Sequence, residues 1–265
     1  MGGQMRLILA FAAILAVAGC NRLQSGSTGP PDLSGRWQGV DSLAEPWPDP
    51  LPLTPAARAS LAAFDPDRQD PAGFCMPYGT PRNTLATGAP MEVLQKPDRV
   101  YFIFQPNLLN AETRRVYLDG RPVPAAKDIV PTWLGISRGH WDHEVLAVET
   151  IGIEPQALIS ETGLSHGTEF RLSERWSLAT GADGRRQLID ELTLEDPKTF
   201  TAPIHTRRVF VPAPDTPLLE PHCSEQLWID NLWRYRLAEH AAAARAAAGT
   251  KHRHPKPSAT VRGSP

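Results

Sequence analysis

The stretch 168–196, TEFRLSERWSLATGADGRRQLIDELTLED, indicates how this chain folds. Its two ends, 168–179 and 186–196, alternate between apolar and polar residues, as β-strands with one buried face do. Between them lies ATGADGRR, whose Asp183-Gly184 pair is a strong signal for a tight hairpin turn. The stretch therefore predicts two antiparallel strands that share a buried face.

The same period of two recurs along the chain. The other segments that show it are 99–105, 113–120, 144–153 and 204–212. Short strands at this spacing, in a chain with 27 prolines and 20 glycines to form turns, indicate an antiparallel sandwich or barrel. We expect one mainly β domain over residues 33–223.

Helices are expected only outside these strands. Residues 224–249 are rich in Ala, Leu, Arg and Glu and carry an apolar stripe at helical spacing, which predicts a C-terminal α-helix docked on the β domain. Residues 250–265 are basic and Pro-rich, and we expect a disordered tail. A short helix is expected at 54–64, with Thr54 as its N-cap and Pro55 at its first position.

The N-terminus has the features of a secretory signal. Arg6 provides the positive charge, and 7–18, LILAFAAILAVA, provides an apolar run that is too short for a comfortable transmembrane helix. The run ends in VAGC at residues 17–20, which resembles the lipobox of bacterial lipoproteins. The resemblance implies that the signal peptide 1–19 is removed and that Cys20 is lipidated. The alternative is an ordinary cleaved signal with a chance cysteine.

A lipidated Cys20 would place the protein at a membrane, since two or three acyl chains anchor a protein stably. Residues 20–32 are polar and rich in Ser, Gly and Pro, and we expect a flexible tether. Asn21 follows Cys20, at the position where an Asp is associated with inner-membrane retention. The resemblance therefore implies an outer-membrane lipoprotein that faces the periplasm.

Export leaves two cysteines for the folded domain, Cys75 and Cys223. In an oxidising compartment an even pair favours one disulfide, and the alternative is two free thiols. The sequence has no Cys/His spacing typical of a metal site, so we expect neither a metal nor another cofactor. The net charge of −2 and the pI near 6.4 do not favour nucleic acid, which prefers a basic surface.

Acidic residues interrupt the apolar faces of three expected strands. Glu174 shares a face with Trp176. Asp190 lies among leucines, and Glu149 interrupts another apolar row. With His166, at the start of the strand of Glu174, they predict a polar cluster in an apolar interior, which is a default ligand-site or active-site hypothesis. Each is equally explicable as a buried hydrogen-bonding group, and an inward arginine would then brace Glu174.

Arg115 and Arg208 are the candidate inward arginines. Arg115 shares a face with Tyr117, and such a pair suits an anionic or sugar-like ligand as well as a salt-bridged strand end. The candidate catalytic residues are His166, Glu174 and Asp190. The candidate ligand-binding residues are Arg115, Tyr117, Glu149, His166, Glu174 and Trp176.

Two resemblances concern the β domain. Gly35-x-Trp37 stands at the start of its first strand, where lipocalins carry a GxW motif, which implies an antiparallel lipocalin-like barrel. The run from Cys75 to Cys223 resembles a family of uncharacterised exported bacterial proteins. The matching pieces are CMPYGTPR (75–82), MEVLQKPDRVYFIF (91–104), RRVYLDGRP (114–122), PTWLGISRGHWDHEVLAVETIG (131–152), GLSHGTEFRLSERW (163–176) and LEDPKTFTAPI (194–204). This resemblance supports the extent of the domain and the cysteine pair, and it implies no catalytic residues.

We expect a binding module whose barrel interior holds a small hydrophobic or amphipathic ligand, contacted by Glu174, His166 and Arg115. One alternative is a hydrolase or isomerase in which His166 works with Glu174 or Asp190 as general acid and base. Another alternative is a structural envelope lipoprotein with a solidly packed barrel. An open interior favours the first two functions, and a filled interior favours the third. The sequence leaves the oligomeric state open.

Overall fold

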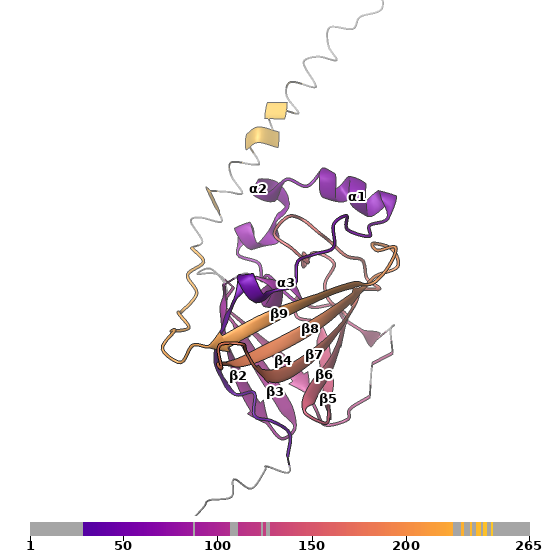
Figure 1. Cartoon of the computed structure of the whole chain (residues 1–265). Helices are drawn as coiled ribbons and strands as arrows, with labels where there is room; N and C mark the ends of the chain where they lie inside the picture. Colours follow the sequence, from indigo (N-terminus) through magenta and orange to yellow (C-terminus); the bar gives the residue numbers. More distant parts are fainter. Residues whose placement is uncertain are drawn as a thin grey trace, which may run out of the picture.

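Nine strands form a closed barrel in the computed structural model of the chain (Figure 1). The strands are β1 (Gly35–Gly39), β2 (Pro90–Lys96), β3 (Arg99–Phe104), β4 (Glu112–Tyr117), β5 (Ile136–Asp142), β6 (Val145–Ile151), β7 (Arg171–Thr180), β8 (Arg186–Glu195) and β9 (Ile204–Pro212). The structure describes residues 29–86, 88–106, 111–122, 124–125, 128–224, 229–230, 234, 237–239, 241–242 and 245. The expected mainly β fold is confirmed.

The order of the strands around the barrel follows the sequence, and β1 pairs with β9 to close it. All pairs are antiparallel except β4 with β5, which run parallel and share only Val116–Ser137 and Tyr117–Arg138. The expectation of a wholly antiparallel barrel is therefore wrong at this point. Only the end of β4 pairs with the start of β5. The two strands run in the same direction, and β5 extends beyond the point at which β4 ends.

The hairpin predicted from residues 168–196 is present as β7 and β8. These strands of ten residues each pair along their whole length. Gly184 in the connecting turn has a φ of +78°, a left-handed conformation that glycine adopts without strain. Leu172, Glu174 and Trp176 are buried on one face of β7, which confirms the alternation expected for this strand.

The inward side chains form two apolar clusters, one toward each end of the barrel. The first consists of Leu33, Trp37, Met91, Val93, Val100, Phe102, Phe104, Val116, Leu146, Val148, Trp176, Leu188 and Phe210. The second consists of Leu53, Leu85, Ile153, Ala157, Ile159, Leu164, Phe170, Leu172, Leu192, Leu194, Phe200 and Ile204. The second cluster includes loop residues, so the loops at that end take part in the core.

Short helices lie over one end of the barrel (Figure 1). They are α1 (Pro55–Ala62), α2 (Pro66–Gln69) and α3 (Arg82–Leu85), with the 3-10 turns η1 (Asp41–Leu43) and η2 (Pro71–Phe74) in the same part of the chain. The side chain of Thr54 accepts a hydrogen bond from the Ala57 N–H at 3.3 Å, which confirms the expected N-cap.

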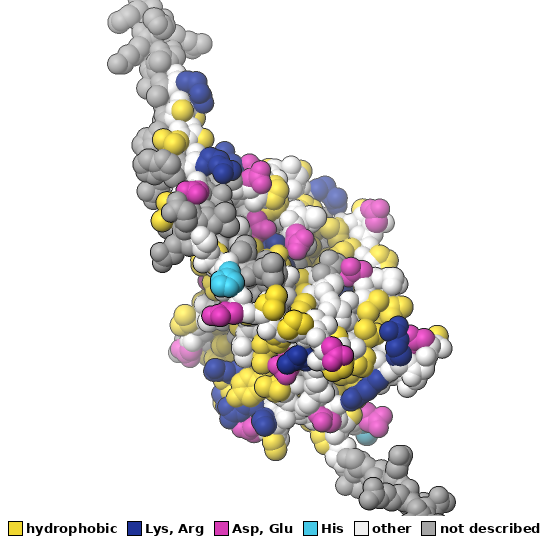
Figure 2. Space-filling view, turned by 90° about the vertical axis from the view of Figure 1, so that its left-hand side faces the viewer, with side chains coloured by type: hydrophobic (Ala, Val, Ile, Leu, Met, Phe, Trp, Pro, Cys, Tyr) yellow, Lys and Arg dark blue, Asp and Glu magenta, His cyan; other side chains and the backbone are white. Residues whose placement is uncertain are grey.

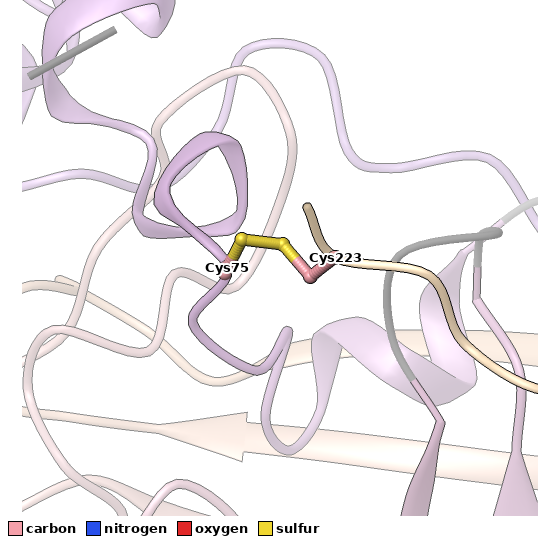
Figure 3. The surroundings of a disulfide bond; sticks show 2 residues. All are labelled: Cys75 and Cys223. Atoms are coloured by element: carbon pink, nitrogen blue, oxygen red, sulfur yellow. A yellow bond between two sulfur atoms is a disulfide. The ribbon is translucent and has the colours of Figure 1, made fainter. Parts of the chain in front are cut away.

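Several contacts hold this helical cap in place, and two of them join it to β4 and to the segment after β9. The buried Glu112 carboxylate on β4 accepts hydrogen bonds from the N–H groups of Tyr78 (2.6 Å) and Gly79 (3.0 Å). Cys75 and Cys223 form a disulfide between positions 148 residues apart, so the segment after β9 is tied to the cap (Figure 3). The disulfide expected from the cysteine count is confirmed.

Several predicted segments lie outside the described residues. They are the signal peptide 1–19, Cys20 with most of the tether 20–32, and the tail 250–265. Within 224–249 the helical described residues are 229–230, 234, 237–239, 241–242 and 245, and the continuous C-terminal helix stays a prediction. In the part of the chain that the structure describes, no helix combines the length and the apolarity needed to cross a membrane.

Candidate functional site

A layer of polar side chains lies between the two apolar clusters. The guanidinium of Arg114 on β4 donates to the carboxylate of Glu174 on β7, at 2.8 Å to Oε1 and also to Oε2. It further donates to Ser137 Oγ at 2.8 Å and to Thr150 Oγ1 at 2.6 Å. The two hydroxyls are hydrogen-bonded to each other at 2.9 Å. This network joins four strands inside the barrel.

The Arg114–Glu174 ion pair crosses the barrel interior. Two strands, β5 and β6, separate β4 from β7 around the wall. The side chains of Arg114 and Glu174 are 1% and 0% exposed. Desolvation of two charges opposes their attraction, and such a pair is tolerated because hydrogen bonds occupy both groups. The ion pair therefore occupies part of the interior at this level.

Glu174 is braced by an inward arginine, as one interpretation of the sequence proposed, but the residue differs. The expectation that Arg115 points inward is wrong, because Arg115 is exposed on the outer face of β4. Val116 is buried in the first apolar cluster, and alternation on a strand then directs Arg114 inward. The apolar side chain of Val116 was the signal that could have identified Arg114 from the sequence.

A second group of buried polar atoms has no hydrogen-bond partner among the described residues. It comprises both carboxyl oxygens of Asp190 on β8, the Nε1–H of Trp176 on β7 and the Nε–H of Arg208 on β9. Trp176 lies directly opposite Asp190 in the strand register, and Asp190 lies opposite Arg208. Three neighbouring strands thus bring these side chains into one row on the inner face, which we call the orphan cluster.

Asp190 is completely buried in the orphan cluster, with 0% of the residue exposed. Burial, followed by the negative charge of Glu174, raises the pKa of Asp190 well above its ordinary value. Arg208 reaches from this row toward the surface, where one terminal nitrogen donates to the Glu45 carbonyl at 3.1 Å. The cluster therefore contains an acid whose neutral form is favoured and one side chain that leads outward.

An aromatic group adjoins the orphan cluster. The rings of Phe102 and Trp176 lie 4.5 Å apart, centroid to centroid, although their strands β3 and β7 are not neighbours. Phe210 on β9 lies 5.9 Å from Trp176. These rings occupy the interior on the side of Trp176 that belongs to the first apolar cluster, which limits the length of any apolar chain bound there.

His166 lies apart from the polar layer, in the loop before β7. Its ring stacks on Phe170 at 4.4 Å, and its Nδ1 contacts the Gly167 carbonyl oxygen at 2.9 Å. Burial lowers the pKa of His166, which favours the neutral imidazole. Among the described residues no hydrogen bond or ion pair joins His166 to Glu174 or Asp190. The pairing required for the acid–base hypothesis is not formed.

Tyr117 and Glu149 belong to the outer wall. The Arg121 guanidinium lies 3.6 Å from the centre of the Tyr117 ring, and Glu149 is exposed. Both line an open surface groove of about 470 Å³, together with Arg138, Arg175 and others. Of the residues proposed from the sequence, the structure thus brings Glu174, Trp176 and Asp190 together inside the barrel. It places Arg115, Tyr117 and Glu149 outside.

Comparison with known proteins does not narrow the function: no family model matches the chain, and no curated protein matches it. Figure 2 shows basic and acidic side chains interspersed on one face of the molecule. That face therefore does not carry the single-sign surface typical of nucleic-acid binding. Within the described residues, no group of three His, Cys, Asp or Glu side chains is placed to hold a metal ion.

Proposed function

We propose that the protein is a lipid-anchored envelope protein whose barrel binds a small molecule at the orphan cluster. The observation that carries this proposal is the row of four unpartnered polar atoms on Trp176, Asp190 and Arg208. Buried polar groups in folded proteins nearly always have partners, because an unmade hydrogen bond costs about 1–3 kcal/mol. A bound polar group would provide those partners.

The size of the ligand follows from the contacts around the cluster. The Arg114–Glu174 pair lies on one side and the Phe102–Trp176 contact on the other. These contacts favour a small ligand over a long apolar one. Access next to Arg208 is supported by the partial exposure of its side chain.

The barrel also supports a likeness to lipocalins. Trp37 of the GxW motif is 2% exposed on β1, and its Nε1–H donates to the Leu33 carbonyl at 3.0 Å. Its burial in the first apolar cluster supports the proposed likeness. The parallel β4–β5 pair departs from an up-and-down antiparallel barrel. The proposed likeness therefore concerns the architecture and the buried tryptophan.

Export and anchoring are part of the same proposal. VAGC at residues 17–20 supports lipidation at Cys20, and Asn21 supports an outer-membrane protein that faces the periplasm. The Cys75–Cys223 disulfide is compatible with that oxidising compartment.

Native mass spectrometry of the full chain, extracted in mild detergent from its own host, tests the binding function. We expect an added mass that disappears on denaturation and that is absent from an Asp190→Leu variant. Glu191→Leu, at the exposed neighbouring position, is the matched control and should retain the added mass. Identical masses for native and denatured protein, after correction for the lipid anchor, would favour a structural envelope lipoprotein whose barrel binds no ligand.

A further inference from the structure

A groove of about 470 Å³ lies on the outer face of β5, β6 and β7. Ala147 on β6 forms part of its floor, and its short side chain lies opposite Arg175 of β7 in the strand register. Glu149, the next outward residue of β6, stands between Arg138 of β5 and Ser173 of β7. Longer side chains thus surround one methyl group and leave a hollow above it, which we call the outer groove.

Most charged side chains that line the outer groove have a partner of opposite charge within the protein. Two of these pairs lie at the surface, and one lies inside the barrel. They are Arg121 with Asp119, Arg175 with Asp142, and Glu174 with Arg114. A ligand in the groove gains little from these groups, because their charges are already balanced.

Arg138 and Glu149 are the two lining charges without such a partner among the described residues. The Arg138 side chain makes one hydrogen bond, from Nη1 to the Arg121 carbonyl oxygen at 2.8 Å, which leaves most of its N–H groups free. Glu149 is exposed, and its carboxylate makes no hydrogen bond or ion pair with any described residue. The two residues are directly opposite in the register, yet the bond to Arg121 draws the guanidinium toward the turn after β4. The groove thus presents an unpaired cation and an unpaired anion on neighbouring strands.

These two free charges select the class of ligand. A simple carboxylate would bind Arg138 but would meet the negative charge of Glu149, and a simple amine would have the reverse difficulty. A neutral diol could contact both groups, but at an open surface it replaces hydrogen bonds to water of similar strength. A zwitterion satisfies both groups with charge-assisted hydrogen bonds, which are roughly twice as strong as neutral ones.

We propose that the outer groove binds a small zwitterionic α-amino acid. Arg138 donates to its carboxylate, Glu149 accepts from its ammonium group, and its short side chain packs on the methyl group of Ala147. The Ser173 hydroxyl, beside Glu149 in the register, is a further acceptor for the ammonium group. This site lies on the outside of the barrel wall, so the inference does not depend on a ligand at the orphan cluster.

Four probes of similar size separate the ligand classes: alanine, propionate, isopropylamine and propane-1,2-diol. The full chain, labelled with ¹³C at its alanine methyl groups, is titrated with each probe in micelles of an uncharged detergent at neutral pH. The methyl signal that is missing from Ala147→Ser is assigned to Ala147 and followed. We expect alanine to shift this signal saturably. We expect at least tenfold weaker responses to the other three probes, since each lacks one or both charges.

Variants test the two contacts through the choice between probes, a readout that a general loss of stability does not produce. Glu149→Gln should weaken alanine binding at least tenfold and remove the preference for alanine over propionate, because no anion remains to hold the ammonium group. Arg138→Gln should likewise remove the preference for alanine over isopropylamine. Glu191 and Arg207 are a second exposed pair, directly opposite on β8 and β9 and away from the outer groove. Glu191→Gln and Arg207→Gln are therefore the matched controls and should bind alanine as the unmodified chain does.

Other outcomes would overturn this inference. Equal responses to alanine and propionate would describe an anion site, and equal responses to alanine and the diol would describe a polyol site. An Ala147 signal unmoved by alanine, or an alanine response unchanged in both Glu149→Gln and Arg138→Gln, would also contradict it. The native mass experiment reports on the barrel interior and this titration on the outer face, so the failure of one is distinguishable from the failure of the other.

Discussion

The Arg114 guanidinium and the Glu174 carboxylate meet inside the barrel, although β5 and β6 separate their strands around the wall. Each group is almost completely buried, and two hydroxyls, of Ser137 and Thr150, receive the remaining contacts of the guanidinium. The pair therefore links two strands that are not neighbours in the barrel wall. It also contributes to the electrostatic environment of Asp190.

Removal of either partner alone should destabilise the fold strongly. Arg114→Leu or Glu174→Leu leaves one buried charge unpaired, and we expect each to lower the free energy of unfolding by about 3–5 kcal/mol. The double variant should be destabilised by less than the sum of the two, because no unpaired charge remains. Urea unfolding of the four proteins measures this coupling. Arg115→Leu, at the exposed adjacent position, is the control and should change the stability by about 0.5 kcal/mol or less. If the effects of the two single variants were additive, the two buried charges would not be coupled.

Asp190 should make the fold less stable as the pH rises. Its pKa is raised in the folded chain above the unfolded value near 3.8, so the folded state holds a proton that the unfolded state has lost. The stabilisation that this proton provides is fully present below the unfolded pKa of Asp190 and is lost as the pH rises through its folded pKa. Asp190→Asn has no proton to lose, so its stability relative to the parent chain should increase with pH over this range. Burial also raises the pKa of Glu112, but both proteins contain Glu112, so its effect cancels in the difference.

Urea unfolding of the parent and Asp190→Asn chains across this pH range makes the comparison. Glu191→Gln, on the outer face of β8, is the control. Its stability relative to the parent chain should not increase with pH over this range. A constant difference between the Asp190→Asn and parent chains would mean that Asp190 titrates alike in the folded and unfolded states.

The disulfide should stabilise the cap and the segment after β9 against unfolding. Cys75→Ser with Cys223→Ser opens a link between residues 148 apart, and loss of a native disulfide typically lowers the free energy of unfolding by about 2–5 kcal/mol. Urea unfolding with and without a reductant measures the effect. The reductant should destabilise the parent chain and leave the double variant unchanged. A reductant-sensitive double variant would assign the effect to something other than this bond.

Lipidation at Cys20 has a direct test. In a bacterial host that processes lipoproteins, the chain should incorporate labelled palmitate and sediment with the membranes. Cys20→Ser should lose the label and leave the membrane fraction, because the anchor consists of acyl chains. Cys75→Ser is the control for a cysteine outside the motif and should keep the label. A labelled Cys20→Ser chain would contradict the assignment of the lipobox.

Alternation in the sequence alone predicted six of the nine strands and most of their faces, but it did not predict β2 or β5. Alternation over 168–196 with its Asp-Gly turn predicted β7 and β8, and it identified Glu174 and Asp190 as inward acids, because period two on a strand is a local property. The cysteine count similarly led to the Cys75–Cys223 bond. The prediction assigned the opposite alternation to β4, and it therefore placed Arg115 inside instead of Arg114, since neighbouring residues on a strand face opposite sides.

Only the tertiary structure decided which side chains meet. The contact of Arg114 with Glu174 depends on how nine strands close, and the row of Trp176, Asp190 and Arg208 depends on the register of three of them. His166 was expected beside Glu174 from its position in the chain, yet the loop before β7 packs it on Phe170. Alternation assigns a residue to the inside of a barrel but not to a partner across it, because strand closure and register are set by the packing of the whole core.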